Sequence, residues 1–557
     1  MYVPPGGTRI VHSQWCNRFD IVQPRPLSSR SPEKVTKESP MPSADVIVVG
    51  YGPTGMTLAA LLGLQGRRVV VLERYDELYN LPRAAAFDDE TMRTFQKLGI
   101  AEKLLPGTNV QAGYVWTNGG GEVLLDIEYD NPGRNGWPAQ YMMYQPHLES
   151  TLDELISSMP SVEVIHGAAV TAITEDAEGV IATAHRADGS SFEVASRFLV
   201  GADGGNGFVR THLGSSWDDY GFSENWLVCD FALRHEVRGL PTFQQVCNPH
   251  GPIAIVNIGP GHHRFSFRLE SGQTREEVTD PAYVWSKVAA FLRREQADLI
   301  RVANYTFSSL IVDRWRRGRI ALAGDAAHQM PPFLAQGMVS GIRDARNLAW
   351  KLGMVLDGAP DDLLDTYQPE REPHVRFITE RAVELGRVQT ERDVERAAAR
   401  DARMIAARRA NAKPDKLIYP GLTGGMIDNH GALLPQGLVS TARGTALFDD
   451  LAGTGWLIVA SEQAALAAVH PEALDAFHRL GGNEAVFAIT SMFAPAEYSD
   501  TAGSFTRFFR QTGAIAALVR PDSYIYGLAH SPQELADLVE SALTTLDIED
   551  WNGVQTR

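Results

Sequence analysis

Cysteine, long apolar runs and basic residues are all scarce in this sequence, and each shortage excludes a class of protein. The 557 residues include only Cys16, Cys229 and Cys247, without Cys-x-x-Cys spacing. Neither a disulfide framework nor a metal site is therefore indicated, and we expect a reducing, cytoplasmic compartment. No stretch approaches about 18 consecutive apolar residues, so we expect no membrane partner. Asp and Glu number 68 against 51 Lys and Arg, and the net charge of −17 argues against nucleic acid as a partner.

The residues that are present are typical of a multidomain globular protein, with 44% hydrophobic and 21% charged residues in a chain long enough for several cores. Residues 1–43 are different. They are rich in Pro, Ser and Gly, and the first 40 carry six basic and three acidic residues. We predict a disordered leader there. Because Met41 directly precedes the first strand pattern, a translation start at Met41 is a second interpretation.

A glycine-rich turn between a strand and a helix is the first motif that points to a ligand. The apolar run 46–49 leads into Gly50-x-Gly52-x-x-Gly55, and a Leu- and Ala-rich helix pattern follows. In such a turn the first glycine permits the bend, the second lets a pyrophosphate approach the backbone, and the third lets helix and strand pack closely. A second apolar run ends at Glu73, where a carboxylate can bind a ribose hydroxyl. The unit predicts a parallel sheet that binds FAD or NAD.

The middle of the chain predicts a second sheet. Residues 216–312 read mostly as antiparallel β-structure with a helix near 282–297, and we interpret this segment as the substrate domain. A buried strand at 320–323 then returns to the first sheet. A helix is expected from about 341 to 356, and a long Arg-, Glu- and Ala-rich helix over 374–412.

The C-terminal part, from about residue 428, predicts a separate β–α–β–β–β–α unit. Its expected strands are 456–459, 486–489, 514–519 and 524–527, with a helix near 463–479 and a turn at 520–523. Ser531 and Glu534 have the spacing of a capping box at the start of the last helix. The unit contains no cysteine, so thiol redox chemistry is excluded. We expect it to serve in packing or in forming a homodimer.

Two further motifs carry a resemblance to a known family. They are Gly201-Ala202-Asp203-Gly204, with Arg210 nearby, and the segment from Gly324-Asp325 to His328, followed by Pro331-Pro332. With the first glycine motif, in this order, the chain resembles the FAD-dependent aromatic hydroxylases, the p-hydroxybenzoate hydroxylase-like group A flavoprotein monooxygenases. It is most similar to the 3-(3-hydroxyphenyl)propionate hydroxylase branch.

The resemblance implies an α/β fold with three domains, the first of them in two segments of the chain. A Rossmann-like FAD-binding domain covers residues 44–215 and 313–412, and a mainly antiparallel β substrate domain is inserted at 216–312. Residues 428–557 are similar to the thioredoxin-like domain on the phenol hydroxylase side of the family, here without a Cys-x-x-Cys motif.

The resemblance also implies roles for individual residues. Asp325 would hold the ribityl chain of FAD, and the segment 332–338 would lie beside the flavin ring. Asp203 matches a fingerprint for FAD and pyridine nucleotide contact, and Arg83 and Gln145 match positions near the flavin and its phosphates. The plainer interpretations are a helix N-cap for Asp325, a solvated loop charge for Arg83 and a helix-start polar group for Gln145. The full set of candidate cofactor-binding residues is Gly50, Gly52, Pro53, Thr54, Gly55, Glu73, Arg74, Arg83, Gln145, Asp203, Gly324, Asp325, Pro332, Gly337 and Met338.

The chemistry implied by the resemblance is hydroxylation of a phenol. NAD(P)H would reduce FAD, and O2 would form a flavin C4a-hydroperoxide that transfers one oxygen to the ring. We expect a small aromatic substrate of the 3-(3-hydroxyphenyl)propionate type, whose carboxylate Arg234, Arg264 or Arg268 could bind. No diagnostic spacing identifies a catalytic base among Tyr220, His235, His250, His262 and His263, so the catalytic residues stay open. The alternatives are another FAD-fold reductase or halogenase, although the halogenase motif Trp-x-Trp-x-Ile-Pro is absent, and a non-catalytic flavin-binding protein.

Two positions depart from the family pattern. The run from Ala335 to Val339 replaces Gly-Gln-Gly-x-Asn, so a methyl group stands in place of the first glycine and the asparagine side chain is missing. Gly207 stands where many relatives have Ser, which removes a helix N-cap. Neither change removes the predicted dinucleotide site.

Overall fold

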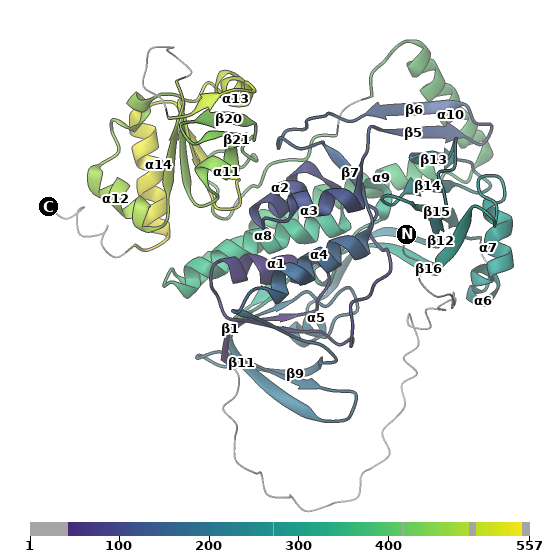
Figure 1. Cartoon of the computed structure of the whole chain (residues 1–557), viewed down its shortest axis with the longest axis horizontal. Helices are drawn as coiled ribbons and strands as arrows, with labels where there is room; N and C mark the ends of the chain where they lie inside the picture. The colour runs from purple at the N-terminus through teal and green to yellow at the C-terminus, as the bar shows by residue number, and fades with distance from the viewer. Residues whose placement is uncertain (1–42, 271, 415–416, 489–496, 549–557) are drawn as a thin grey trace, which may run out of the picture.

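Two eight-stranded sheets and a smaller four-stranded sheet dominate the computed structural model, which describes residues 43–270, 272–414, 417–488 and 497–548. Figure 1 shows the C-terminal unit in yellow-green at one end of the molecule and the teal second sheet at the other. The long helix α8 (Gly337–Leu356) runs through the middle, between them.

The first sheet contains the predicted βαβ unit. It consists of β1 (Ser43–Val49), α1 (Pro53–Leu64) and β2 (Val69–Leu72), and the two strands pair in parallel. Helix α1 has little polar surface because it packs on both the sheet and α8. The other strands of this sheet are β8 (Val162–Ile165), β9 (Ala169–Glu175), β10 (Val180–His185), β11 (Ser191–Gly201), β17 (Arg316–Arg317) and β18 (Ile320–Leu322).

The strand order of the first sheet brings the three motifs together. β11 lies between β1 and β18, and all three run parallel, with Gly201 paired to Val49 on one side and to Leu322 on the other. The segments that follow these strands therefore leave the sheet at one edge, where the carboxyl ends of parallel strands form a ligand crevice.

The second sheet is mainly antiparallel, as predicted for residues 216–312. β13 and β5 pair in parallel, so this sheet also takes strands from an earlier segment, residues 113–128. Its strands are β5 (Gly113–Asn118), β6 (Val123–Glu128), β12 (Trp217–Leu233), β13 (Phe243–Cys247), β14 (Ile253–Asn257), β15 (His262–Arg268), β16 (Ala297–Val312) and β19 (His328–Gln329).

The helix predicted near 282–297 is wrong in its extent. The chain forms two short helices instead, α6 (Arg275–Thr279) and α7 (Pro281–Val288), the second capped by the Asp280 carboxylate. From Ala297 the chain pairs along almost the whole of β12. This long antiparallel pairing outweighs the local helix propensity of the preceding residues.

The single helix predicted over 374–412 is two helices. α9 (Tyr367–Gln389) ends before Thr390, and α10 (Val394–Arg409) starts after Asp393, whose carboxylate accepts a hydrogen bond from the Arg396 amide. α8 also starts earlier than predicted, at Gly337 rather than near 341.

The C-terminal sheet has the order β23-β22-β25-β26. β22 (Leu457–Ala460) and β23 (Asn483–Val486) are parallel, with α12 (Pro471–Arg479) between them, and β25 (Ala516–Val519) and β26 (Ile525–Ala529) are antiparallel, followed by α14 (Pro532–Thr545). This βαβ-plus-ββα arrangement agrees with the predicted thioredoxin-like fold. Part of the predicted strand 486–489 lies outside the described residues.

Several elements of this unit were not predicted. They are α11 (Phe448–Ala452), α13 (Ser504–Thr512), β20 (Leu438–Thr441), β21 (Gly444–Leu447) and β24 (Ser499–Asp500). The capping box is only half formed: the Ser531 hydroxyl accepts from the Glu534 amide, but the Glu534 carboxylate accepts from the His530 amide instead of that of Ser531.

The remaining helices and strands connect the two large sheets. They are α2 (Asp89–Lys97), α3 (Ala101–Leu104), α4 (Gln145–Ser157), α5 (Phe208–Leu213), β3 (Ala86–Asp88), β4 (Thr108–Val110) and β7 (Gln140–Met143).

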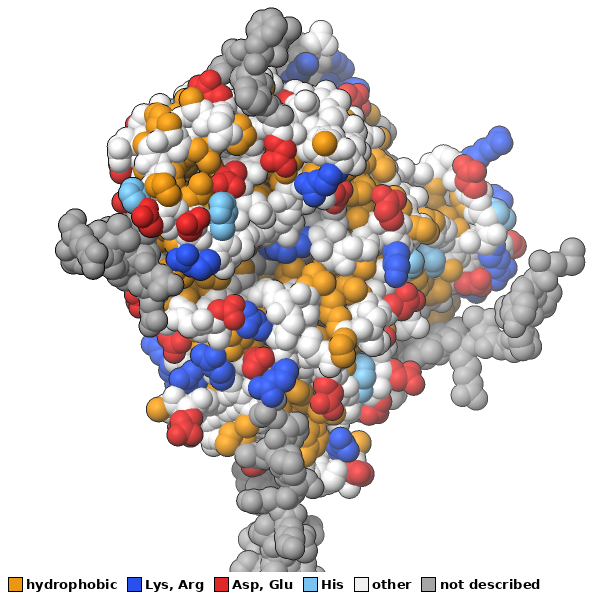
Figure 2. All heavy atoms as spheres, turned by 60° about the vertical axis from the view of Figure 1, so that its left-hand side comes forward, with side chains coloured by type: hydrophobic (Ala, Val, Ile, Leu, Met, Phe, Trp, Pro, Cys, Tyr) orange, Lys and Arg blue, Asp and Glu red, His pale blue; other side chains and the backbone are white. Residues whose placement is uncertain are grey.

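The surface shows no large field of one charge on the face seen in Figure 2, where acidic and basic side chains alternate with apolar ones. None of the described helices is long and apolar enough to span a bilayer. Within the same residues, no group of three or more His, Cys, Asp and Glu side chains could hold a metal ion.

Candidate functional site

The glycine-rich turn after β1 is shaped by close contacts at two of its three glycines. Gly50 has φ +103°, and a Cβ there would collide with the carbonyl oxygen of Ala202, in the second motif. A Cβ at Gly55 would collide with the carbonyl oxygen of Gly50. A Cβ at Gly52, in contrast, would meet no atom closer than Nη2 of Arg83, at 3.9 Å. The protein itself leaves space at Gly52, as a phosphate-binding turn requires.

Thr54 joins the first motif to the third. A Cβ at Gly324 would lie 2.7 Å from the Thr54 hydroxyl oxygen, and one at Gly341 in α8 would also collide with it. Pro53 is the first residue of α1, a position that lacks an amide hydrogen-bond partner in any helix. Pro53 and Thr54 therefore set the start of α1 against the third motif.

Glu73 lies at the end of β2, beside the glycine turn. Its carboxylate accepts hydrogen bonds from the Tyr51 amide at 2.7 Å and from the Tyr75 amide at 3.0 Å. Arg74 is exposed next to it and lies over the Tyr75 ring. Each Glu73 oxygen keeps a further lone pair, so the carboxylate can still accept a ribose hydroxyl.

Asp325 is the unpaired carboxylate of the site. It lies in the short 3-10 helix Gly324–Ala326 between two buried residues, and its own side chain remains accessible to solvent. The buried residues around it nevertheless raise the pKa of the carboxylate by desolvation. Among the described residues it has no hydrogen-bond partner, and it caps neither its own helix nor α8. A carboxylate without a protein partner can accept hydrogen bonds from the hydroxyl groups of a ribityl chain.

Arg83 is held in place by α4. Oε1 of Gln145, the first residue of α4, accepts hydrogen bonds from the amides of Arg83 and Ala84. The Gln145 amide group donates to Glu149 at 2.7 Å, and Nη2 of Arg83 donates to the same Glu149 oxygen at 2.8 Å. Gln145 thus anchors the loop, and the Arg83 guanidinium is fixed beside the open space at Gly52.

Asp203 has a structural role as well as a free oxygen. Its Oδ2 accepts from the Val209 amide in the first turn of α5, at 3.0 Å, while its Oδ1 is buried without a hydrogen bond. Gly207, the N-cap residue of α5, supplies no side-chain bond. Asp203 therefore replaces the N-cap that the sequence appeared to have lost at Gly207. Burial raises the pKa of Asp203.

The segment 332–338 connects the third motif to α8. Pro332 begins a 3-10 turn, Gln336 is the N-cap residue of α8, and Gly337 and Met338 are the first residues of that helix. Ala335 has φ +55°, a left-handed backbone conformation that residues with a Cβ rarely adopt. Its methyl group packs against a cluster between β3, β7 and β14 that is formed by Ala86, Met142, Val256 and Ile258.

Ala335→Gly should therefore stabilise the protein. The left-handed conformation costs a residue with a Cβ about 1–2 kcal/mol, and glycine adopts it freely at the cost of more entropy in the unfolded chain. We expect the free energy of unfolding to rise by about 1 kcal/mol in urea denaturation. The control Ala345→Gly, inside α8, should lower it by about 1 kcal/mol. Equal losses in both variants would contradict this account of Ala335.

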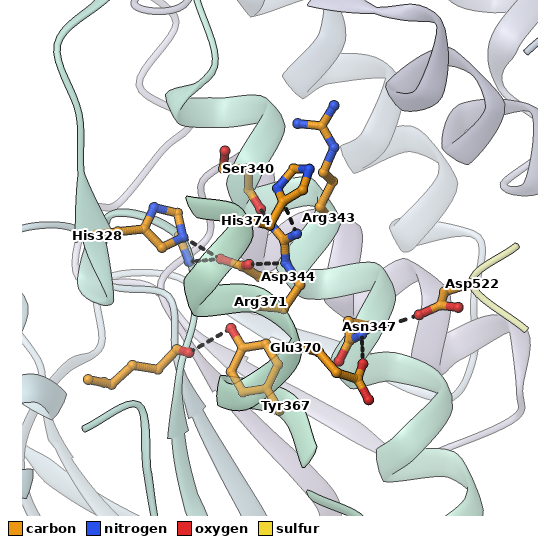
Figure 3. A network of polar contacts seen from close by, with 12 residues as sticks. His328, Ser340, Arg343, Asp344, Asn347, Tyr367, Glu370, Arg371, His374 and Asp522 are labelled. Carbon is orange, nitrogen blue, oxygen red and sulfur yellow. Dashed lines mark hydrogen bonds and ion pairs between the residues drawn. The ribbon is translucent and has the colours of Figure 1, made fainter. Parts of the chain in front are cut away.

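Asp344 is an important residue that sequence reasoning missed. From α8, its Oδ2 accepts from the Gly324 amide at 3.0 Å and contacts Nε2 of His328 at 2.6 Å, while its Oδ1 accepts from Nε of Arg371 at 2.9 Å (Figure 3). Although burial alone would raise the pKa of Asp344, His328 and Arg371 hold it below its usual value. Asp344 thus fastens the third motif between α8 and α9. A signal existed, because Arg343-Asp344 is a charged pair among apolar residues in the helix predicted from about 341 to 356.

The arginines considered for a substrate carboxylate all have other partners. Arg234 forms an exposed ion pair with Asp298. Arg264 pairs with Asp230 at 2.6 Å and donates to two backbone carbonyls of the loop that carries Arg83. Arg268 donates to the carbonyl of Thr390 at 2.9 Å, to that of Pro249 and to Glu270.

The candidate bases of the second sheet do not all converge on one place, although His235 and His263 line the same cavity. The His262 ring stacks on Tyr144, next to Gln145, at a centroid distance of 3.9 Å. His263 packs against Phe265, and burial lowers its pKa to about 4. His235 and His250 are exposed. The Tyr220 ring lies under Arg376. None of these is therefore assigned as the base.

Comparison with known proteins gives the family. The profile described as FAD binding domain matches residues 43–382, and the HcaD C-terminal domain matches residues 431–545. The chain belongs to the FAD binding domain family. This membership confirms the predicted FAD-dependent aromatic hydroxylase family, together with its fold class, its enzyme class and its cofactors, FAD and NAD(P)H.

Relatives in this family are hydroxylases. The chain is 65% identical over 505 residues to the probable NADH-specific resorcinol 4-hydroxylase of Rhodococcus jostii (strain RHA1), covering 90% of this chain and 95% of that one. It is 35% identical over 458 residues to the 3-(3-hydroxy-phenyl)propionate/3-hydroxycinnamic acid hydroxylase of Mycolicibacterium gilvum (strain PYR-GCK), covering 78% and 79%.

Solved structures share the fold. The flavin-dependent monooxygenase PieE, in complex with FAD and substrate, aligns with a TM-score of 0.77 at 21% identity over 92% of this chain and all of that one. Aklavinone-11 hydroxylase, in a ternary complex with FAD and aklavinone, aligns with a TM-score of 0.72 at 23% identity over 90% and 99%.

Proposed function

We propose that this protein is an NADH-dependent flavin monooxygenase that adds one hydroxyl group to a resorcinol-type ring. The observation that carries the substrate class is the state of the arginines in the second sheet. Arg234, Arg264 and Arg268 are all engaged, so none is free to bind the carboxylate of a hydroxyphenylpropionate. An uncharged dihydroxybenzene needs no such cation. The relative that is 65% identical carries the name of a resorcinol hydroxylase, which supports the same substrate class.

The proposed cofactor contacts follow from groups of the site that keep hydrogen-bonding capacity beyond their contacts within the protein. The turn at Gly52 and the Arg83 guanidinium would hold the FAD pyrophosphate, and Glu73 a ribose hydroxyl. The Asp325 carboxylate would accept the ribityl hydroxyls, and the segment 332–338 would lie along the flavin ring. When bound, FAD supplies the redox and oxygen chemistry, while the chain orients the substrate and excludes water.

The wider assignments are proposals too. We propose a cytoplasmic enzyme that uses O2, with an FAD-binding domain at 44–215 and 313–412, a substrate domain at 216–312 and a C-terminal domain at 428–557. Strands β5 and β6 would belong with the substrate domain, because they extend its sheet. A homodimer is part of the same proposal.

Substrate-stimulated NADH oxidation tests this function. With purified FAD-loaded protein, resorcinol should stimulate NADH oxidation. Its kcat/KM should be at least about tenfold higher than that of 3-(3-hydroxyphenyl)propionate, which corresponds to about 1.4 kcal/mol of transition-state stabilisation. NADPH compared with NADH in the same assay tests the reductant. A higher kcat/KM for the carboxylated phenol would overturn the proposed substrate class.

A further inference from the structure

The turn 520–524 of the C-terminal unit is inserted into the FAD-binding part of the molecule. Its polar side chains are buried, with Arg520 and Asp522 each 1% exposed. Nη2 of Arg346 in α8 donates to the Ser523 hydroxyl at 2.7 Å, and Nε1 of Trp350 donates to Asp522 at 3.1 Å. The buried surface of this turn therefore faces α8 directly.

One side of this contact is an anchor of buried charges. Glu370 in α9 accepts from Arg520 at 2.8 Å and pairs with Lys351 in α8 at the same distance. Burial lowers the pKa of Lys351 to about 8. Removing one member of such a group leaves its partner buried and unpaired, which is costly. The anchor fixes the C-terminal unit to α8 and α9.

The other side of the turn begins a chain of hydrogen bonds that leads away from the C-terminal unit. The Tyr524 hydroxyl donates to Oε1 of Glu90 in α2 at 2.8 Å. Oε2 of Glu90 accepts from Nε of Arg343 at 2.7 Å, and Nη2 of Arg343 donates to Asp88 at 2.6 Å. Nη1 of Arg343 donates to Oε1 of Gln336 at 2.8 Å.

Gln336 is the place where this chain meets the cofactor segment. It is 1% exposed, follows the left-handed Ala335 and directly precedes Gly337 and Met338. As the N-cap residue of α8, its side chain accepts no bond from a backbone amide of that helix. In the described part of the chain, its amide oxygen is held by the guanidinium of Arg343, two turns further along α8. Figure 3 shows Arg343 on α8 extending away from Asp344, which fastens the opposite side of the same helix.

We propose that Tyr524, Glu90, Arg343 and Gln336 are positioning residues through which the docked C-terminal unit fixes the segment 332–338. The C-terminal unit is then a support of the flavin site and not an independent module. Buried polar chains of this kind hold one arrangement because every partial loss leaves an unsatisfied group. The inference rests on the proposed FAD site.

Tyr524→Phe tests the far end of the chain, with Ser523→Ala as the matched control. Both remove one buried hydroxyl from the same turn, but the Ser523 bond leads to Arg346 and not to Gln336. We expect Tyr524→Phe to raise the Kd for FAD about fivefold, to shift the absorption spectrum of the bound flavin, and to divert more NADH to H2O2. Ser523→Ala should leave the Kd within about twofold.

A double-mutant cycle with Gln336→Leu separates this role from plain stability. Gln336→Leu removes the hydrogen bond that Gln336 accepts from Arg343. If Tyr524 acts through that bond, adding Tyr524→Phe to Gln336→Leu should leave the Kd for FAD unchanged. If the two residues act independently, the fold-changes in Kd would multiply. Equal Kd changes in Tyr524→Phe and Ser523→Ala, or multiplying effects in the cycle, would overturn the inference. A wild-type protein that binds FAD but hydroxylates no phenol would instead contradict the proposed function and leave this result standing.

Discussion

Asp325→Ala is expected to weaken FAD binding about 100-fold. Two hydrogen bonds to a charged carboxylate contribute about 1.5 kcal/mol each, and about 1.4 kcal/mol corresponds to a factor of ten in Kd. The carboxylate has no hydrogen-bond partner in the described protein, so removing it deletes ligand contacts without breaking a protein contact. Quenching of flavin fluorescence during titration of the apoprotein measures the Kd.

The same variant should make the apoprotein more stable. Burial raises the pKa of Asp325, so the folded protein holds this proton more tightly than the unfolded chain does, and the ionised group destabilises the fold at neutral pH. Urea denaturation without FAD should show a higher free energy of unfolding. Asp298→Ala, at an exposed ion pair, is the control and should leave the Kd unchanged. An unchanged Kd in Asp325→Ala would remove Asp325 from the cofactor site.

Asp344→Ala is expected to lower the free energy of unfolding by about 3–5 kcal/mol, because it leaves the buried Arg371 guanidinium without its carboxylate. It also releases the Gly324 amide and His328, so the third motif loses its attachment to α8. The pKa of Asp344 is depressed in the fold. Its stabilising contribution is therefore present above the unfolded pKa of about 3.9 and is lost as the pH falls below it.

Denaturation at a fixed FAD concentration measures this loss. Asp361→Ala is the control, since Asp361 forms only a 3.9 Å surface pair with Arg319 and should cost less than about 1 kcal/mol. The difference between the two variants should shrink at acidic pH, where Asp344 is protonated in both folded and unfolded wild type. Equal losses in the two variants at pH 7 would contradict the role given to Asp344.

The features that sequence reasoning predicts well depend on short stretches of chain. The βαβ unit and its glycines follow from about thirty residues, because turn, helix and strand each have a local pattern. The convergence of the three motifs also follows, since parallel strands place their carboxyl ends at one edge. Gly50 and Gly55 then make the contacts that the motif requires.

The features that were missed depend on partners far apart in the sequence. Asp344 meets Arg371 across two helices, and Glu90 meets Tyr524 across 434 residues, which no local pattern encodes. The break between α9 and α10 has a distant contribution as well as the local N-cap at Asp393, because Arg268 of the second sheet donates to the Thr390 carbonyl at that point. Tertiary contacts of this kind override helix propensity.

The most direct test of the proposed function follows the oxygen atom. FAD-loaded protein is given NADH, resorcinol and isotopically labelled oxygen gas, and the product is analysed by mass spectrometry. The proposed function predicts a trihydroxybenzene that carries one labelled oxygen, formed in near-equal amount to the NADH consumed. NADH consumption with H2O2 as the sole oxygen product, for every phenol supplied, would contradict it.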